Sequence, residues 1–228
     1  MKVVIATPSI AGPTEPYKQA LAGSAPLLER YDTRFVQEVG SPYISAARAT
    51  MLRKAMDGQA DVVVFIDYDL SWRPDDLVTL IEAEGEIVAG TYRFKKDDHE
   101  YMGGWNVDSS GRPVLRDSDG AISANRVPAG FLKVTKEAVD KFMRAYPELI
   151  YGSRYAASVD LFNHGAIDGV WYGEDYAFSK RWTEKCGDIW LVPDLDLTHH
   201  AADKAYPGNL HEYLMRQPGG AKEGQPWP

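Results

Sequence analysis

The sequence predicts an α/β domain with a mostly parallel central sheet flanked by helices, and two features of the hydrophobicity pattern support this. Residues 3–6, 62–66 and 189–192 are continuous apolar runs, which is the pattern of strands buried on both faces. Amphipathic segments with the length and period of helices, such as residues 174–185, lie between such runs. The alternation of apolar strands with helices is typical of β-α-β units and of a parallel sheet.

Each predicted element begins or ends at a capping or helix-breaking residue. In chain order the predicted elements are a strand at 3–6, an amphipathic segment to about Glu29, a strand at 33–39, a helix from Ser41-Pro42 to Gly58, a strand at 61–66, a helix opened by Pro74, a strand at 86–92, a strand at 131–134, a helix capped by Thr135 to about Tyr146, a helix at 174–185 ended by Gly187, and a strand at 189–192.

Two segments lack this regular pattern. Residues 93–126 are polar and rich in Gly and Asp, so we expect hairpins and loops there, one of which could act as a lid. The segment from residue 201 contains several Gly and Pro residues and is expected to be irregular. We therefore expect a catalytic domain at 1–200 and a carboxyl-terminal extension at 201–228 that packs on it or frays from it.

Composition excludes several classes of protein. The 228 residues are 44% hydrophobic and 25% charged, which is typical of a globular chain and not of a disordered one. The formal net charge of -8 argues against binding nucleic acid by charge alone. Cys186 is the only cysteine, which excludes an intrachain disulfide. Since we find neither a long apolar run nor a signal-peptide pattern, we expect a cytoplasmic protein without a transmembrane segment.

The strongest motif is Asp67-Tyr68-Asp69, which directly follows the apolar strand at 61–66. Ligands of α/β sheets bind at the carboxyl ends of the strands, where these two carboxylates are expected to lie. Paired carboxylates can hold a divalent ion, and the ion can neutralise a departing diphosphate. The alternative is that both aspartates only cap the turn that follows.

Two further groups of polar residues are candidates for chemistry. Glu174 and Asp175 open a helix and lie beside aromatic residues, including Trp171. This setting suits sugar stacking and raises carboxylate basicity, although acids at a helix start can also be simple caps. His199 and His200 follow the last strand, and an imidazole is a suitable further ligand for an ion such as Mn²⁺. The spacing alone does not choose between the two histidines.

The order of the motifs resembles that of GT-A type glycosyltransferases, and it looks closest to the compact branch related to family 2 and to the mannan-polymerase type. The resemblance covers most of residues 2–200. The motifs that carry it are Thr7-Pro8, Ile44-Ser45-Ala46-Ala47-Arg48, Val64-Phe65-Ile66-Asp67-Tyr68-Asp69, Gly90-Thr91-Tyr92, Ala129-Gly130-Phe131, Gly173-Glu174-Asp175-Tyr176-Ala177-Phe178 and Leu197-Thr198-His199.

The resemblance implies a GT-A (Rossmann-like) fold and a metal-dependent transfer of a sugar from a UDP- or GDP-linked donor. Asp69 would bind Mn²⁺ or Mg²⁺, Asp67 would contact the ribose or water on the metal, and His199 would complete the metal site. Thr7 and Pro8 would line the pocket for the nucleobase.

The resemblance also implies roles for basic and acidic residues around the donor. Arg48 would reach the nucleotide or its diphosphate, and Glu174 and Asp175 would form an acidic pair on the acceptor side. The family often has a second basic residue in the Arg48 segment, which this chain lacks. Tyr92, Arg93 and Lys95 could supply the compensating contacts or charge.

Several alternatives remain open from the sequence. An apolar strand ending in Asp-x-Asp also occurs in haloacid-dehalogenase-type phosphatases, and paired acids also serve metal-dependent nucleotidyltransferases. A non-catalytic sugar- or nucleotide-binding module is a third class. The acceptor could be a glycan, a lipid-linked precursor, a protein or, less in keeping with the negative charge, a modified DNA base. Asp175 would deprotonate the acceptor in an inverting reaction and position it in a retaining one.

Overall fold

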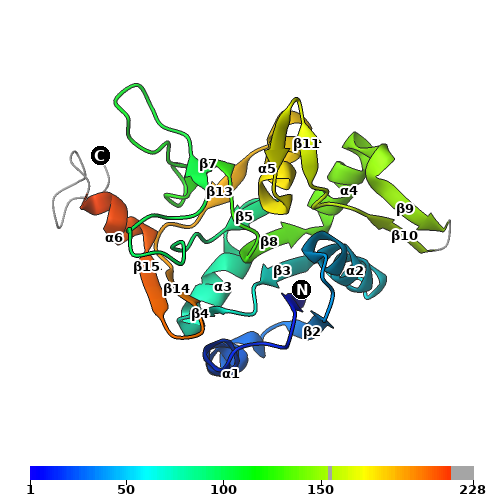
Figure 1. Cartoon of the computed structure of the whole chain (residues 1–228), viewed down its shortest axis with the longest axis horizontal. Helices are drawn as coiled ribbons and strands as arrows, with labels where there is room; N and C mark the ends of the chain where they lie inside the picture. Colours follow the sequence, from blue (N-terminus) through cyan, green and yellow to red (C-terminus); the bar gives the residue numbers. More distant parts are fainter. Residues whose placement is uncertain (154–155, 217–228) are drawn as a thin grey trace.

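The structure is a computed structural model that describes residues 1–153 and 156–216 (Figure 1). Within these ranges the main sheet has eight strands in the order β2-β1-β3-β8-β5-β13-β7-β6. The strands are β1 (Lys2–Ser9), β2 (Asp32–Val39), β3 (Val62–Ile66), β5 (Ile87–Ala89), β6 (Gly104–Trp105), β7 (Ile122–Arg126), β8 (Phe131–Thr135) and β13 (Ile189–Leu191). The helices are α1 (Glu15–Leu28), α2 (Ile44–Asp57), α3 (Pro74–Glu82), α4 (Lys136–Ala145), α5 (Glu174–Lys185) and α6 (Leu210–Met215), with a 3-10 turn at Pro147–Leu149.

Most strands of the main sheet point in one direction. β1 pairs in parallel with both β2 and β3, and β5 pairs in parallel with β13. β8 lies between β3 and β5 and is antiparallel to both, so β5 runs in the same direction as β3. β7 is antiparallel to β13, and β6 is antiparallel to β7. Only β7 and β8 therefore oppose the other strands of this sheet, and the predicted mostly parallel α/β fold is confirmed.

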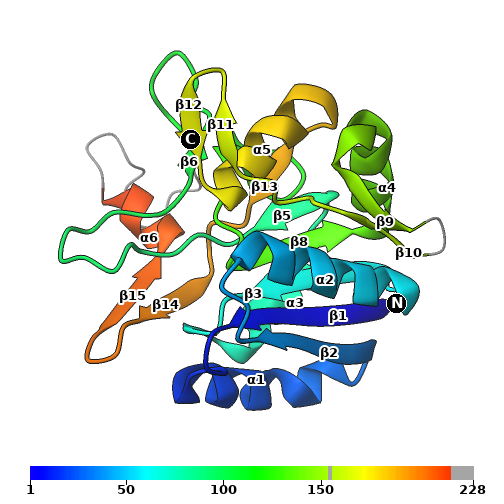
Figure 2. The ribbon, with the colours of Figure 1, turned by 45° about the vertical axis from the view of Figure 1, so that its right-hand side comes forward.

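Helices cover both faces of the sheet, and each face has its own core (Figures 1 and 2). Val4 of β1 belongs to a core that contains apolar residues of α2, α4 and α5. Its neighbour Ile5 belongs to the opposite core, which contains residues of α1 and α3. Successive side chains of a strand point to opposite faces, so a strand between two cores must be apolar at every position. This explains the continuous apolar runs in the sequence.

A second sheet, which the sequence did not predict, packs beside the end of β3. It has the order β15-β14-β4, with β4 at Leu70–Trp72, β14 at Asp196–His200 and β15 at Ala205–Asn209. β4 and β14 are antiparallel, and Leu70 lies opposite His199. The prediction of an irregular segment from residue 201 is therefore wrong for β15 and α6. Residues 217–228 of that prediction lie outside the described residues.

Other boundaries also differ from the predictions. α2 begins at Ile44 and not at Pro42, because the Ser41 hydroxyl bonds to the backbone of Tyr43 and forms a local turn instead of capping the helix. The strand predicted at 86–92 is limited to Ile87–Ala89. The loop-rich pattern predicted for 93–126 is confirmed, with short strands and isolated bridges.

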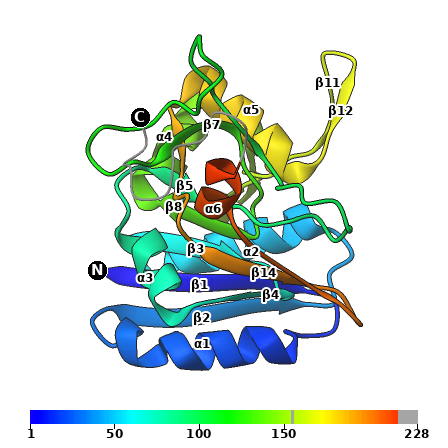
Figure 3. The ribbon, with the colours of Figure 1, turned by 90° about the vertical axis from the view of Figure 1, so that its left-hand side faces the viewer.

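Two short hairpins were not predicted, since neither contains a long alternating run. One joins β9 (Ile150–Ser153) to β10 (Ala156–Val159), and the other joins β11 (Gly165–Ile167) to β12 (Val170–Tyr172). The β11–β12 hairpin projects from the body of the molecule and leads directly into α5 (Figure 3). Among the described residues, the helices are all too short or too polar to cross a lipid bilayer.

The junction between the two sheets leaves no room for a side chain at Gly90. A Cβ atom there would lie 2.8 Å from a methyl carbon of Leu195, 2.8 Å from one of Leu197 and 3.0 Å from the ring of Phe131. All three neighbours are buried. We expect Gly90→Ala to lower the free energy of unfolding by about 1–3 kcal/mol, because overpacked cores must shift to relieve the contacts. Urea denaturation followed by tryptophan fluorescence measures this, and an unchanged midpoint would contradict the packing described.

Candidate functional site

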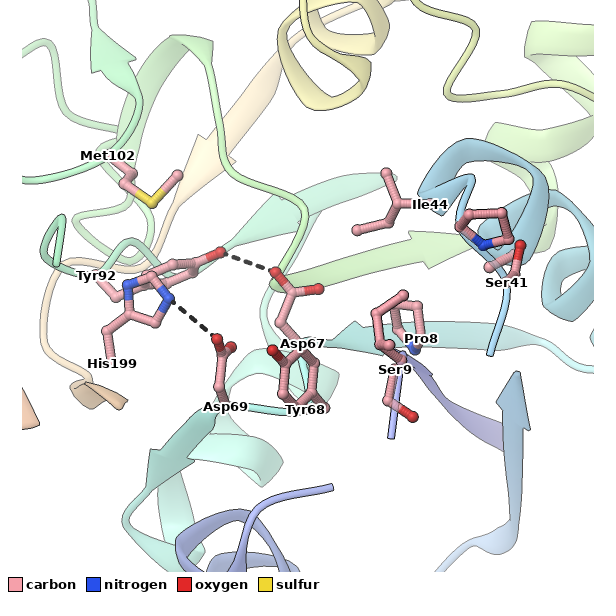
Figure 4. Close-up of a pocket in the computed structure, with 13 residues that line it drawn as sticks. Pro8, Ser9, Ser41, Ile44, Asp67, Tyr68, Asp69, Tyr92, Met102 and His199 are labelled. Atoms are coloured by element: carbon pink, nitrogen blue, oxygen red, sulfur yellow. Dashed lines mark hydrogen bonds and ion pairs between the residues drawn. The ribbon is translucent and has the colours of Figure 1, made fainter. Parts of the chain in front are cut away.

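A pocket of about 280 Å³ lies at the carboxyl ends of β1 and β3 (Figure 4). Since these strands are parallel neighbours, the residues that follow them meet at one edge of the sheet, where ligands of α/β folds bind. The close-up shows Asp67 and Asp69 between Tyr92 and His199 on one side and Pro8 and Ser9 on the other. The lining residues are Pro8, Ser9, Ile10, Ser41, Pro42, Ile44, Ala47, Asp67, Tyr68, Asp69, Tyr92, Met102 and His199.

Asp69 and His199 form the first polar pair of the pocket. The pairing of β4 with β14 brings them together, and the His200 N–H donates to the Asp69 carbonyl at 2.8 Å. His199 Nε2 lies 3.7 Å from Asp69 Oδ2, and both side chains are largely buried. His199 Nδ1 lies 2.9 Å from the Arg93 carbonyl, which can only accept, so Nδ1 carries the proton. The lone pair of Nε2 is therefore free to face Asp69.

The environment keeps His199 neutral. Burial lowers its pKa, and this outweighs the opposing effects of the Arg93 carbonyl and of Asp69. A neutral imidazole with a fixed tautomer is the form that binds a metal ion. His200 lies next along β14, and its Nε2 is 2.7 Å from the Ser71 hydroxyl. The structure therefore places His199, and not His200, in the pocket lining beside Asp69.

Asp67 is joined to Glu174 by one buried arginine. Arg48 Nη2 donates to Asp67 Oδ1 at 2.8 Å, and Arg48 Nη1 donates to Glu174 Oε1 at 2.8 Å. The Arg48 side chain is only 2% exposed. Burial alone would lower the pKa of Arg48, but Asp67 and Glu174 outweigh this and raise it. The family resemblance implied that Arg48 would reach the nucleotide. In the structure, Nη1 and Nη2 of Arg48 instead donate to carboxylates of the protein.

The acidic pair Glu174 and Asp175 lies in the first turn of α5, after Gly173. Within residues 1–153 and 156–216, Asp175 forms no ion pair with an arginine, and its Oδ1 accepts the Tyr176 N–H at 2.8 Å. Burial raises the pKa of Asp175 to about 6, the nearby Glu174 carboxylate adds to this, and Arg48 opposes it. Asp175 is thus a carboxyl group that can exchange a proton near neutral pH.

Of the remaining predicted site residues, three line the pocket or bond to its carboxylates, and Thr7 does not. Pro8 and Tyr92 line the pocket, and the Tyr92 hydroxyl donates to Asp67 Oδ2 at 3.4 Å. Burial raises the pKa of Tyr92 well above its ordinary value. Lys95 forms an ion pair with Asp69. Thr7 is buried, its hydroxyl bonds to that of Tyr17, and it does not line the pocket in the described structure.

The donor set fits a divalent ion held by two protein ligands. No group of three or more His, Cys, Asp or Glu side chains in residues 1–153 and 156–216 is arranged to hold a metal. The predicted set of Asp67, Asp69 and His199 is therefore not assembled, because Asp67 is engaged by Arg48 and Tyr92. The carboxylate of Asp69, which pairs with Lys95, and the unprotonated Nε2 of His199 remain, and oxygen with nitrogen is a donor pair that suits Mn²⁺.

Gly130 shapes the pocket, although the sequence analysis gave it no role of its own. A Cβ atom at this position would fall on the Tyr92 hydroxyl and the Asp67 carboxylate. The sequence analysis noted it only within the Ala129-Gly130-Phe131 motif, directly before the strand at 131–134. Other lining residues that the sequence analysis did not propose for the site include Ser9, Tyr68 and Met102.

Neither the protein-family models nor the curated proteins contain a match to this chain. Among solved structures, A197 from STIV is similar with a TM-score of 0.52 and 16% identity, over 92% of this chain and 95% of that chain. At this identity the likeness shows the fold alone. Two weaker likenesses are GalNAc-T7 with UDP, GalNAc and Mn²⁺ (TM-score 0.45, 12% identity, 87% of this chain and 43% of that chain) and S. aureus TarS 1-349 with UDP-GlcNAc (TM-score 0.43, 12% identity, 91% and 58%).

Arg48 provides a direct test of the buried ion-pair network. We expect Arg48→Met to lower the free energy of unfolding by about 3–5 kcal/mol, because it leaves two carboxylates without their counter-ion. Arg53→Met on the same helix is the control, since Arg53 pairs with Asp57 on the surface. That change should cost less than about 1 kcal/mol. Equal effects of the two variants in urea denaturation would contradict the role of Arg48.

Proposed function

We propose that this chain is a metal-dependent glycosyltransferase that moves a sugar from a nucleotide diphosphate sugar to an acceptor hydroxyl. One observation carries the proposal: the pocket that holds the Asp69–His199 pair also contains Asp67, which one buried arginine joins to Glu174, the residue before Asp175 in the first turn of α5. Asp175 lies close enough to Asp67 and Arg48 for both to affect its pKa, so a pair suited to a metal and a group suited to proton transfer lie around the same carboxylate. A metal-dependent, inverting transfer from a nucleotide sugar uses both.

The donor would lie in the pocket with its diphosphate toward Asp69 and His199. These two side chains would hold Mn²⁺ or Mg²⁺, which when bound supplies positive charge to the departing diphosphate. The opposite wall, with Pro8 and Ile44, offers apolar surface to the nucleobase of UDP or GDP. The Tyr92 hydroxyl and Arg48 orient Asp67, which leaves Asp67 as a fixed acceptor for a ribose hydroxyl.

The acceptor would approach from the side of α5. In an inverting reaction, Asp175 takes the proton of the acceptor hydroxyl as its oxygen bonds to the anomeric carbon. The bond from that carbon to the diphosphate oxygen breaks at the same time, and its electron pair leaves with the nucleoside diphosphate. A pKa of about 6 fits this step, since the group is mostly ionised at pH 7 yet basic enough to accept a proton. In a retaining reaction, Asp175 would position the acceptor instead.

The structure is less suited to the phosphatase alternative. That mechanism requires the first aspartate, Asp67, as a nucleophile with a free oxygen. One Asp67 oxygen accepts from Arg48 and the other from Tyr92. A non-catalytic binding module would not require an ionisable group such as Asp175 with its pKa near neutrality. A nucleotidyltransferase would use the same metal site, so product analysis must separate it from a glycosyltransferase.

We propose a carbohydrate-containing molecule as the acceptor. Trp171 is 72% exposed on the hairpin that leads into α5, and His164 lies edge-on to it at 6.2 Å between ring centroids. An exposed indole near the candidate base can stack on a sugar ring. A free glycan, a lipid-linked precursor and a glycosylated protein all present such a ring. A modified DNA base is disfavoured by the net charge of -8.

Titration calorimetry with UDP and GDP, each with and without Mn²⁺, tests the proposed donor site. We expect one of the two nucleotides to bind, and to bind more tightly with Mn²⁺. Asp69→Ala should abolish the Mn²⁺-dependent part of the affinity, because it removes a ligand of the ion. Asp175→Asn is the control and should bind the nucleotide as the wild type does. Nucleotide affinity that Asp69→Ala leaves unchanged in Mn²⁺ would refute the assignment.

Asp175 has an effect on stability that can be separated from its effect on activity. The folded-state pKa is raised from 3.8 to about 6, so ionised Asp175 destabilises the folded protein above pH 6. We expect Asp175→Asn to stabilise the protein at pH 7.5 by on the order of 2 kcal/mol, and this gain to vanish near pH 4. Thermal unfolding at the two pH values measures it.

The same variant should lose sugar transfer while it keeps nucleotide binding. Transfer by the wild-type protein should decline as the pH falls through about 6, because Asp175 is then protonated and cannot accept the acceptor proton. A wild-type rate independent of pH between 5 and 7, or normal turnover by Asp175→Asn, would show that Asp175 is not the base.

A further inference from the structure

Lys95 occupies the place at which a cation would meet Asp69. Its ammonium group pairs with Asp69 Oδ2. This is the same oxygen that lies 3.7 Å from His199 Nε2. The Asp69 oxygen that faces His199, and that would bind a metal together with it, therefore already has a positively charged partner. A divalent ion bound between Asp69 Oδ2 and His199 Nε2 would compete with the ammonium group for that oxygen.

The side chain of Lys95 can move without its backbone. The loop that carries it is closed at its base by the bridge between Arg93 and Tyr101 and by the Met102 N–H, which donates to the Tyr92 carbonyl at 2.9 Å. Lys95 itself is 33% exposed, and Asp69 is the one carboxylate in ion-pair contact with it among the described residues. A lysine ammonium is a point charge on a flexible four-carbon stem, so it can exchange one anion for another nearby.

The charges around the pocket make such an exchange more favourable when a second anion is present. Arg48 is shared between Asp67 and Glu174, and Lys95 pairs with Asp69. A divalent ion that binds alone must displace the ammonium and then lie next to it, which costs repulsion. A divalent ion that arrives with a nucleoside diphosphate brings the negative charge that the displaced ammonium needs.

We propose that Lys95 is an exchangeable counter-ion that makes metal binding conditional on the donor. Without donor, its ammonium holds Asp69 and weakens the site for a divalent ion. When a nucleoside diphosphate binds with the ion, the ammonium passes from Asp69 to the diphosphate oxygens. The inference rests on the proposed function for the identity of this second anion. The competition between Lys95 and the ion at Asp69 does not depend on it.

Two measurable consequences follow from this exchange. Lys95→Met should bind Mn²⁺ alone roughly five- to tenfold more tightly than the wild type, because Asp69 is no longer masked. The affinity for Mn²⁺ should rise with UDP or GDP in the wild type, and this rise should be smaller in Lys95→Met. Coupling between two ligands is reciprocal, so Mn²⁺ should strengthen nucleotide binding by the same factor.

The experiment titrates Mn²⁺ into the full chain and follows free Mn²⁺ by electron paramagnetic resonance, first without nucleotide and then with saturating UDP or GDP. Lys96→Met is the matched control. Lys96 is the next residue, and it pairs with Glu100 instead of with Asp69. It should bind Mn²⁺ as the wild type does. Lys95→Gln provides a second variant that removes the charge and keeps a polar side chain, and circular dichroism verifies the fold of each.

Tighter Mn²⁺ binding by Lys95→Met or Lys95→Gln, but not by Lys96→Met, supports the counter-ion role. Equal affinities in all four proteins, or no Mn²⁺ binding by any of them, overturn it. If the Lys95 variants bind Mn²⁺ more tightly but no protein binds UDP or GDP, then the competition at Asp69 stands and the proposed transferase function fails. The two failures are therefore distinguishable.

Discussion

The buried guanidinium of Arg48 is the interaction on which the rest of the site depends. The guanidinium stays protonated at any ordinary pH. Its side chain is only 2% exposed, and a buried charge without a counter-ion is costly, so it requires carboxylate partners. Its two carboxylate partners come from the end of β3 and the start of α5, and Glu174 is 126 residues away in the chain. The pair of bonds therefore fixes the end of β3 relative to the start of α5.

The distribution of positive partners gives each carboxylate a different character. Asp67 and Glu174 share a buried arginine that cannot leave. Asp69 has a lysine on a partly exposed loop, which can leave. In the described part of the chain Asp175 pairs with neither an arginine nor a lysine, and its pKa is raised to about 6 by burial and by Glu174. Asp67 and Asp69 line the pocket, and the carboxylates of α5 lie close enough to Arg48 to interact with it. The neighbours of each carboxylate thus determine whether it suits orientation, cation binding or proton transfer.

The parts of the site that the sequence could predict are those governed by local pattern. The apolar run of β3 predicted where Asp67 and Asp69 lie, and the amphipathic period of α5 predicted that Glu174 and Asp175 open a helix. The convergence of Asp69 with His199 depends on the pairing of β4 with β14, two short strands far apart in the chain. The carboxylate partners of Arg48 are likewise long-range contacts. Nothing in a local window encodes such contacts, so spacing alone left the histidine undecided, and the family resemblance implied a nucleotide contact for Arg48 instead of these carboxylates.

The antiparallel direction of β8 explains why a glycine, Gly130, lies beside the carboxylate of Asp67 at the pocket. Because β8 is antiparallel to β3, its first residues lie beside the last residues of β3, with Phe131 opposite Ile66. The Asp67 N–H donates to the Gly130 carbonyl at 2.9 Å, so the backbone at 130 holds the strand end directly. A parallel strand in the same place would instead end at this edge, and the loop that follows it would place further side chains beside Asp67. The antiparallel strand instead begins there with a residue that has no side chain, and this leaves room for Tyr92 to reach Asp67.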